Sequence, residues 1–504
     1  MAPMIPNDLR PHLERAGFLC VENARLWDGA PSIALLAHCR LPKDVRTSAV
    51  AVTASIGDGL LAVQAIRACG APVVFVVRGP RWECWRQETP SPAYLDSGSS
   101  KELAPFFDKH KDALTPDAIY RAKVWGRLDP AMRQTEFVDI GLMPLVESEI
   151  GRKVSELLED SVSGLAKELG WKRAGELDKQ QARWLIQAPF WLLAAKILQD
   201  KRVPRFIQMD LQNPEEVYER LSRHYNSERP QPVAVQNERR TALLRVAVKI
   251  SEFAALDLMT TEALGHVYES TLINDATRKL LGTHSTPSWL IDYVVGGLRP
   301  LIVKLPPIGR RVFEPACGHA GFLVSALRLL DELRPANFSE PREKYLRKRL
   351  RGVDVDSFSQ DVARLALTLA DVPNPNGWSL DIADVFMGNL LAEESAKADI
   401  VLGNPPFENF DAKDRPANSL VNKAAEIFRR SIENLAPNSV FGFVLPQGFL
   451  TSKEGADCRR YVQKHCEIRE VTLFADKVFQ YGEAESAIIL GQKKEAEPQS
   501  RIRK

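Results

Sequence analysis

The spacing of apolar and polar residues changes along this 504-residue chain, and each regime predicts a different kind of structure. In residues 1–125, apolar runs such as 48–55 and 72–79 are short and bounded by turn residues, which is typical of strands. A helical spacing separates these two runs. The first regime therefore predicts an α/β domain at residues 1–125.

In residues 126–282 the apolar positions recur about every 3.6 residues, which predicts a helical domain. Its linker is expected at 226–238, which is polar and contains prolines. From 283 to 493, β-like runs alternate with helical ones, and this order favours a mostly parallel sheet covered by helices. The polar tail at 494–504 is expected to be disordered.

Composition narrows the classes of function. The formal net charge is only +2, so any nucleic-acid site must come from local patches, such as the basic run at 342–351. The longest apolar stretches, such as 188–198, are too short to span a bilayer, and no signal peptide is evident. We therefore expect a cytoplasmic protein with no membrane contact. Seven dispersed cysteines without a CxxC pair predict no metal site.

The first chemical motif is "RRVFEPACGHAGFLVSALRLL", residues 310–330, which runs from a strand through a glycine loop into a helix. Glu314 falls at the carboxyl end of the strand. Gly318 and Gly321 allow a tight bend and a close approach to a ligand. Because the loop lacks the lysine of a phosphate-binding loop, its acid suits a ligand with a cationic ammonium group.

Two further acids fall at the ends of the next strands. Asp354 ends the second strand, where it could accept both hydroxyls of a ribose, and Asp384 ends the third, where it could accept from an adenine amine. A strand-end aspartate alone is more often a helix cap or a turn residue. The ordered set of three acids indicates a site for an adenosine that carries an amino acid.

After the three strand-end acids, the fourth feature along the chain is the stretch "VLGNPPF". Two prolines cannot donate to a sheet ladder, so a strand ends at Asn404 and the chain stiffens there. The stretch fixes an amide, a rigid turn and an aromatic ring in one place. A structural turn is the alternative interpretation.

Taken in order, these motifs resemble those of the γ-type adenine-N6 DNA methyltransferases of restriction–modification and phage-defence systems. "FEPACGHAGFL" resembles the cofactor loop D-P-A-C-G-S-G-x-F-L, and "NPPF" resembles the catalytic tetrapeptide N-P-P-Y/F. "LGTHSTPSWLIDYVV" (281–295) resembles the preceding Thr-Pro motif, and "LGHVYESTL" (264–272) a helix of the larger members. Thr286 and Pro287 are also expected to be the N-cap and first residue of a helix.

The resemblance implies a Rossmann-like methyltransferase domain that uses S-adenosyl-L-methionine, preceded by a helical domain and an N-terminal α/β domain. It implies transfer of a methyl group to adenine N6 in double-stranded DNA, with the adenine flipped out of the duplex. The catalytic residues that it implies are Asn404, Pro405, Pro406 and Phe407. The cofactor-binding residues that it implies are Thr286, Pro287, Glu314, Pro315, Ala316, Gly318, Gly321, Phe322, Asp354, Val355, Asp384, Val385 and Asn404.

The sequence departs from the family pattern at His319, where a serine is usual, and at Gly491, where small members have an aromatic residue. Phe479 or Tyr481 could supply that second aromatic. No target-recognition domain follows the motifs, so a separate specificity subunit, a shortened protein or weak specificity is expected. The alternatives are a non-catalytic DNA-binding subunit, or a methyltransferase acting on protein glutamine or RNA.

The N-terminal domain has a strand order found in restriction nucleases. It contains no D/E-x-K metal-binding pair. Either it is a degenerate nuclease-like domain or it is an unrelated α/β module.

Overall fold

The computed structural model describes residues 4–24, 33–126, 136–171, 179–225, 237–272, 286–372, 377–474 and 485–495. The chain divides into two compact units. The first comprises Met1–Asn274 with Thr368–Pro375, and the second comprises Asp275–Leu367 with Asn376–Lys504. The segments expected as separate domains, 1–125 and 126–282, thus share one unit as far as Asn274. Most of the expected linker, 226–236, lies outside the described residues, as does most of the tail.

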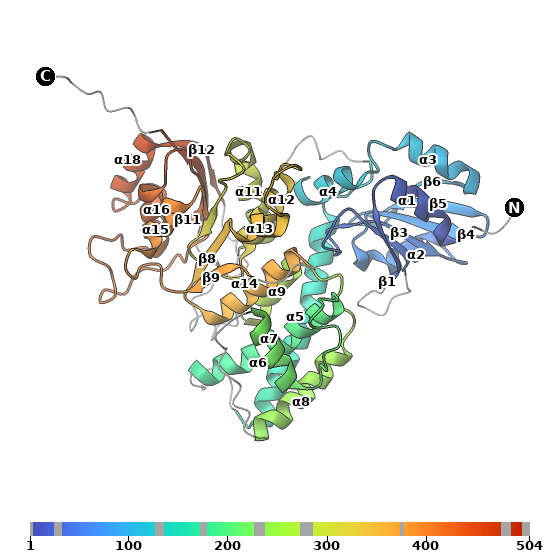
Figure 1. The fold of residues 1–504 in the computed structure, drawn as a ribbon, viewed down its shortest axis with the longest axis horizontal. Helices are drawn as coiled ribbons and strands as arrows, with labels where there is room; N and C mark the ends of the chain where they lie inside the picture. The colour runs from blue at the N-terminus through green and yellow to red at the C-terminus, as the bar shows by residue number, and fades with distance from the viewer. Residues whose placement is uncertain are drawn as a thin grey trace. The chain divides into compact units, whose positions relative to one another are not determined.

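A six-stranded sheet forms the N-terminal part of the first unit (Figure 1). Its strands, in sheet order, are β1 (Leu19–Ala24), β2 (Ile33–His38), β3 (Ser48–Ala54), β4 (Val73–Arg78), β5 (Arg81–Arg86) and β6 (Ala93–Ser99). All neighbours are antiparallel except β3 and β4, which are parallel and joined through α2 (Gly59–Ala65). The continuous apolar runs of β3 and β4 fit their burial at the centre of the sheet.

The remainder of the first unit is helical. Its main helices are α5 (Leu142–Glu168), α6 (Lys179–Asp200), α7 (Pro214–Tyr225), α8 (Asn237–Glu252) and α9 (Thr261–Leu272). A buried ion cluster connects them to the sheet, because Arg46 after β2 lies 2.6 Å from Glu147 on α5 and 3.1 Å from Glu262 on α9. Buried charges are stable only when they are paired, so the cluster holds α5 and α9 against the segment between β2 and β3.

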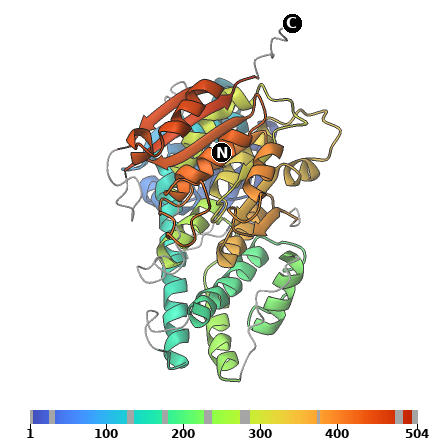
Figure 2. The same ribbon diagram turned by 90° about the vertical axis from the view of Figure 1, so that its left-hand side faces the viewer.

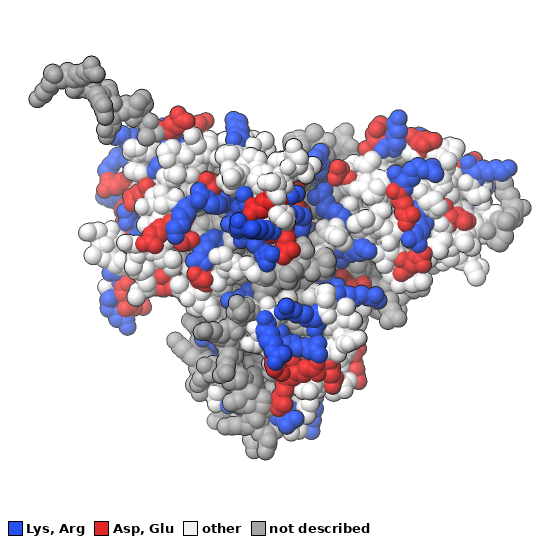
Figure 3. All heavy atoms as spheres, viewed as in Figure 1, with Lys and Arg blue, Asp and Glu red and all other residues white. Residues whose placement is uncertain are grey.

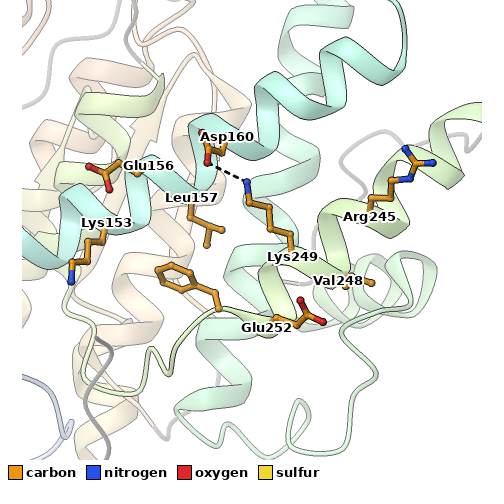
Figure 4. A pocket seen from close by; sticks show the side chains of 9 residues that line it. Lys153, Glu156, Leu157, Asp160, Arg245, Val248, Lys249 and Glu252 are labelled. Atoms are coloured by element: carbon orange, nitrogen blue, oxygen red, sulfur yellow. Dashed lines mark hydrogen bonds and ion pairs between the residues drawn. The ribbon is translucent and has the colours of Figure 1, made fainter. Parts of the chain in front are cut away.

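Helices α5 and α8 lie close to each other and border a hollow of about 580 Å³ (Figure 4). Lys249 on α8 extends towards Asp160 on α5, and their charged atoms are 3.3 Å apart. The lining mixes acids and bases in similar number: Lys153, Glu156, Asp160, Arg245, Lys249 and Glu252. Because these charges offset one another, the hollow does not select a ligand of either sign.

The second unit contains a seven-stranded sheet in the order β12-β13-β11-β10-β7-β8-β9. The strands are β7 (Val312–Glu314), β8 (Leu350–Asp354), β9 (Ser379–Ile382), β10 (Ile400–Gly403), β11 (Val440–Pro446), β12 (Cys466–Leu473) and β13 (Ser486–Lys493). The five strands from β11 to β9 are parallel, whereas β13 is antiparallel to both of its neighbours. The prediction of a mostly parallel α/β sheet is confirmed. Figure 2 shows the closing pair β12 and β13 side by side.

Helices accompany this sheet in chain order. They are α11 (Ser288–Ile302), α12 (Gly321–Glu332), α13 (Arg342–Arg347), α14 (Ser357–Ala370), α15 (Leu390–Lys397), α16 (Lys423–Asn434), α17 (Gly448–Thr451) and α18 (Ala456–His465). The core beneath α16 is aromatic, since Phe428 lies 5.2 Å from Phe443 and 5.4 Å from Phe449, ring centre to ring centre. Among the described residues, no helix is both long enough and apolar enough to cross a membrane.

The basic run at 342–351 is occupied by interactions inside the protein. Arg342 pairs with Asp331 at 2.7 Å, Lys348 pairs with Glu340 at 2.9 Å, and Arg349 is buried. Figure 3 shows Lys and Arg gathered over α13, with Asp and Glu among them. These pairings favour a structural role for the run over a contact with phosphates.

Candidate active site

Four parallel strands bring the predicted site residues to one edge of the second sheet. Strand β7 ends at Glu314, β8 at Asp354, β9 at Ile382, just before Asp384, and β10 at Gly403, just before Asn404. The strand order reverses direction between β7 and β10. In open α/β sheets, ligands bind outside the carboxyl ends of the strands at such a switch point.

The loop between β7 and α12 is tightly bent. Gly318 and Ala320 both have left-handed backbone conformations, with φ of 49° and 65°. The Gly318 N–H donates to Asp354 Oδ2 at 2.8 Å, so the loop is attached to the end of β8. Along the same stretch Pro315 and Phe322 are buried, while Ala316 and His319 are half-buried.

The two glycines of this loop serve different purposes. A Cβ atom at Gly321 would lie 2.4 Å from Cδ1 of Ile291, so the Ile291 side chain would have to move to admit it. A Cβ atom at Gly318 would meet nothing within 4 Å. Gly321 is therefore closely packed against α11, whereas Gly318 borders open space in which a ligand could approach the backbone.

Glu314 forms no ion pair with the residues that the structure describes. It is 3% exposed, and its Oε2 accepts a hydrogen bond of 3.3 Å from the Leu323 N–H in the first turn of α12. Burial raises the pKa of Glu314 well above its ordinary value of 4.5; the Leu323 N–H opposes this shift, and the nearby Asp354 charge adds to it. A cationic ligand group would restore the charged form.

Asp354 and Asp356 have separate roles. Asp356 caps α14, since its Oδ2 accepts from the Ser359 N–H at 2.8 Å and from the Ser359 hydroxyl at 3.0 Å. Asp354 accepts from two backbone N–H groups at the sheet edge, those of Gly318 and Asp356. Burial raises the pKa of Asp354 above its ordinary value. The helix-cap interpretation thus applies to Asp356, and Asp354 remains at the mouth of the loop.

The end of β9 presents a mixed polar and apolar surface. Asp384 is exposed and accepts the Phe386 N–H at 2.9 Å, as a turn residue does, while Val385 is packed in the core. Nearby apolar side chains face solvent: Val355 is 63% exposed and Ile382, paired in register with Asp354, is 53% exposed. Such a surface can contact the face of a flat heterocycle.

Asn404 is fixed by a residue from a different motif. Its Nδ2 donates to the Thr286 hydroxyl at 2.9 Å. Its Oδ1 is buried and has no hydrogen-bond partner among the described residues. Buried amide oxygens nearly always accept a hydrogen bond. The direction of the Asn404 oxygen is fixed by the hydrogen bond of its own amide nitrogen, so this oxygen is an acceptor that a ligand's N–H group could use.

The expectation that Thr286 caps α11 is wrong. The cap residue is Pro287, with ψ of 138°, and no side chain bonds to the first turn. The Leu290 N–H instead bonds to the Pro287 carbonyl at 2.9 Å. Because Thr286 lies one residue before the cap, its hydroxyl is available to Asn404.

The remainder of the tetrapeptide leads away from β10. Pro405 is buried, and Pro406 and Phe407 are half-buried, with Phe407 against the core under α16. The Phe407 carbonyl accepts a hydrogen bond of 2.6 Å from Nδ2 of Asn422. Sequence reasoning missed Asn422; the one available signal was an asparagine directly before an amphipathic run, which is typical of a helix N-cap.

The glycine at position 491 has a packing cause. It lies within β13, where a Cβ atom would come 2.6 Å from the Phe441 ring and 2.7 Å from the Glu467 carbonyl. No aromatic side chain fits there. Phe479 and Tyr481, the other candidates for a second aromatic residue, lie outside the described residues.

Two comparisons with known proteins both match DNA methylases. Residues 259–503 match the family N-6 DNA Methylase. Over 249 residues the chain is 24% identical to the methylase subunit of the type I restriction enzyme EcoEI from Escherichia coli, a match that covers 47% of this chain and 48% of the relative. The chain thus aligns with about half the length of this curated relative.

The fold is shared with a solved structure. The DrdV–DNA complex matches with a TM-score of 0.50 and 13% identity over 96% of this chain and 53% of that one. A modification subunit of a putative type I restriction enzyme from Vibrio vulnificus matches with a TM-score of 0.46 and 15% identity, over 69% of this chain and 85% of that one. The sheet order, the motifs along its edge and the family match agree. The family match covers residues 259–503, which include this sheet and the motifs along its edge.

Proposed function

We propose that this chain transfers a methyl group from S-adenosyl-L-methionine to the N6 amine of adenine in DNA. The observation that supports the proposal best is the Asn404 amide, whose nitrogen is held by Thr286 and whose buried oxygen has no partner in the described part of the chain. The adenine amine has two N–H groups to donate. An acceptor fixed in one direction matches that substrate, since unmet acceptors are costly until the donor arrives.

The residues at the sheet edge fit the cofactor. Glu314 would accept its ammonium group, Asp354 its ribose hydroxyls, and Asp384 its adenine amine, with Val355 and Ile382 beside the adenine face. The open space at Gly318 would admit its methionine portion. S-adenosyl-L-methionine supplies the methyl group as a sulfonium, and its positive charge would offset the buried carboxyl group of Glu314.

The protein's own contribution is positioning. The N6 lone pair of adenine is delocalised into the ring, so the amine is a poor nucleophile. Asn404 Oδ1 and the Pro405 carbonyl would each accept one N–H, which draws the nitrogen towards tetrahedral geometry and frees the lone pair. Phe407 would stack on the base. Alignment of this kind lowers a barrier by several kcal/mol.

A base stacked inside a duplex cannot reach the buried Asn404 oxygen, so the adenine would flip out of the helix. We further propose that a separate subunit selects the target sequence, within a restriction–modification or phage-defence complex. The type I relative is itself named as a subunit, which supports this arrangement.

The test is the identity of the methylated product. The purified chain is incubated with radiolabelled S-adenosyl-L-methionine and adenine-methylation-free bacteriophage DNA, and the DNA is digested to nucleosides. Bacterial RNA and lysate protein are offered in parallel as acceptors. The proposal predicts label in N6-methyladenine from DNA; label only in RNA or in protein glutamine would overturn it.

A further inference from the structure

Asn422 lies between the N-P-P-F stretch and helix α16, and both the oxygen and the nitrogen of its side-chain amide form hydrogen bonds. Its Oδ1 accepts the Ala425 N–H at 3.1 Å, which caps α16. Its Nδ2 donates to the Phe407 carbonyl at 2.6 Å. One side chain therefore connects the end of the N-P-P-F stretch to the start of α16.

The helix at the other end of this connection is firmly anchored. Ala424 and Phe428 of α16 are fully buried, and Glu426, also fully buried, pairs with Arg429 at 2.7 Å. Glu426 also accepts the Leu420 N–H at 3.0 Å, which fixes the chain just before Asn422. The N-terminus of α16 is thus a rigid reference point within the second unit.

Backbone hydrogen bonds bring the two segments together beside Asn422. The Lys423 N–H donates to the Glu408 carbonyl at 3.0 Å, and the Phe410 N–H donates to the Val421 carbonyl at 2.9 Å. These bonds begin one residue after Phe407. The peptide of Phe407 itself is held by the Asn422 side chain, which restrains the backbone that carries the Phe407 ring.

We propose that Asn422 is a positioning residue, which holds the backbone of Phe407 so that its ring is placed to stack on the target adenine. The role in methyl transfer rests on the proposed function; the restraint on Phe407 does not. Asn422 touches neither substrate nor cofactor in this account. It acts through Phe407, because a base that is held loosely loses the alignment on which transfer depends.

Aspartate and serine at position 422 separate this role from helix capping. Both residues cap helices about as well as asparagine, so α16 keeps its cap. Aspartate has no donor, and the serine hydroxyl is one bond shorter than the Asn422 amide that reaches the Phe407 carbonyl. Asn213 offers a matched control, since its Oδ1 accepts the Glu216 N–H at 3.4 Å at the start of α7 in the other unit.

The experiment compares N422D, N422S and N213D with the wild type in the full chain. Fluorine NMR of 4-fluorophenylalanine incorporated at position 407 reports on the ring without any need for activity. Single-turnover methyl transfer to bacteriophage DNA and calorimetric cofactor affinity complete the set. We expect N422D and N422S to shift or split the fluorine signal and to slow transfer roughly 3- to 10-fold or more, the loss of one hydrogen bond, at unchanged cofactor affinity.

The outcomes are distinct. A fluorine signal unchanged in both Asn422 variants would overturn the proposal, and so would an effect of N422D that N422S does not share, since it would come from the added charge. An equal shift in N213D would also overturn it. If the signal moves as expected but the wild type methylates no acceptor, the restraint on Phe407 stands and the proposed function fails.

Discussion

The Asn404 side-chain nitrogen donates a 2.9 Å hydrogen bond to the Thr286 hydroxyl, although 118 positions separate the two residues in sequence. This contact fixes the orientation of the Asn404 amide. With the nitrogen occupied by Thr286, the oxygen is left as a buried acceptor. Thr286 of the Thr-Pro motif thus orients the Asn404 amide, and Pro287 of the same motif is the cap residue of α11.

Replacing Thr286 by valine should therefore slow methyl transfer. Valine keeps the shape of the side chain but cannot accept from Asn404, so the amide is free to rotate. Loss of one hydrogen bond corresponds to roughly 3- to 10-fold in the single-turnover rate. Thr286→Ser keeps the hydroxyl and should restore most of the rate. A valine variant as fast as the wild type would show that the contact does not orient Asn404.

The neighbouring acids Asp354 and Asp356 should separate cofactor binding from stability. Asp354→Ala should weaken cofactor affinity roughly 10- to 100-fold, as expected for lost hydrogen bonds to a charged group. Asp356→Ala removes the cap of α14 and should lower the free energy of unfolding by about 1 kcal/mol, with affinity close to that of the wild type. Calorimetry and thermal melts check both. Equal loss of affinity in the two variants would remove the ribose role of Asp354.

Glu314 should make the cofactor-free protein lose stability as the pH rises. At low pH both the folded and the unfolded chain hold its proton. Above the ordinary pKa of 4.5 the unfolded chain releases that proton, while burial keeps it on the folded chain. The contribution of Glu314 to stability is thus present at low pH and lost as the pH rises through its raised folded pKa.

Glu314→Gln tests this directly, because glutamine keeps the acceptor for the Leu323 N–H but has no proton to lose. Its melting temperature without cofactor should exceed that of the wild type at about pH 8, and the gap should close near pH 4. Cofactor affinity should fall in the same variant, since the ammonium partner is gone. A pH-independent gap, or unchanged affinity, would contradict this role.

The sequence sufficed for those features that depend on local pattern. The continuous apolar runs of β3 and β4 and the strand–loop–helix around Glu314 were predicted where the structure has them. Strands β1 and β6 were not, because "LCVENA" and "AYLDSGS" mix polar and turn-forming residues among few apolar ones, and their partners across the sheet decide their conformation.

The candidate site also contains features that a local pattern predicts and features that depend on contacts between distant segments. Strand-end acids and the N-P-P-F turn are local signals, so their positions at one sheet edge could be predicted. The contact of Thr286 with Asn404 and that of Asn422 with Phe407 join segments that meet only in the folded chain. Side-chain directions of this kind depend on tertiary packing, which no local pattern contains.

The central claim is that the unpaired Asn404 oxygen activates the adenine amine. The most direct measurement compares single-turnover methyl transfer and calorimetric cofactor affinity in the wild type and in Asn404→Ala. Asn434→Ala, an exposed asparagine at the end of α16, is the matched control. We expect Asn404→Ala to abolish transfer of label to N6-methyladenine while cofactor affinity stays close to that of the wild type. Transfer by Asn404→Ala at the wild-type rate would contradict the account.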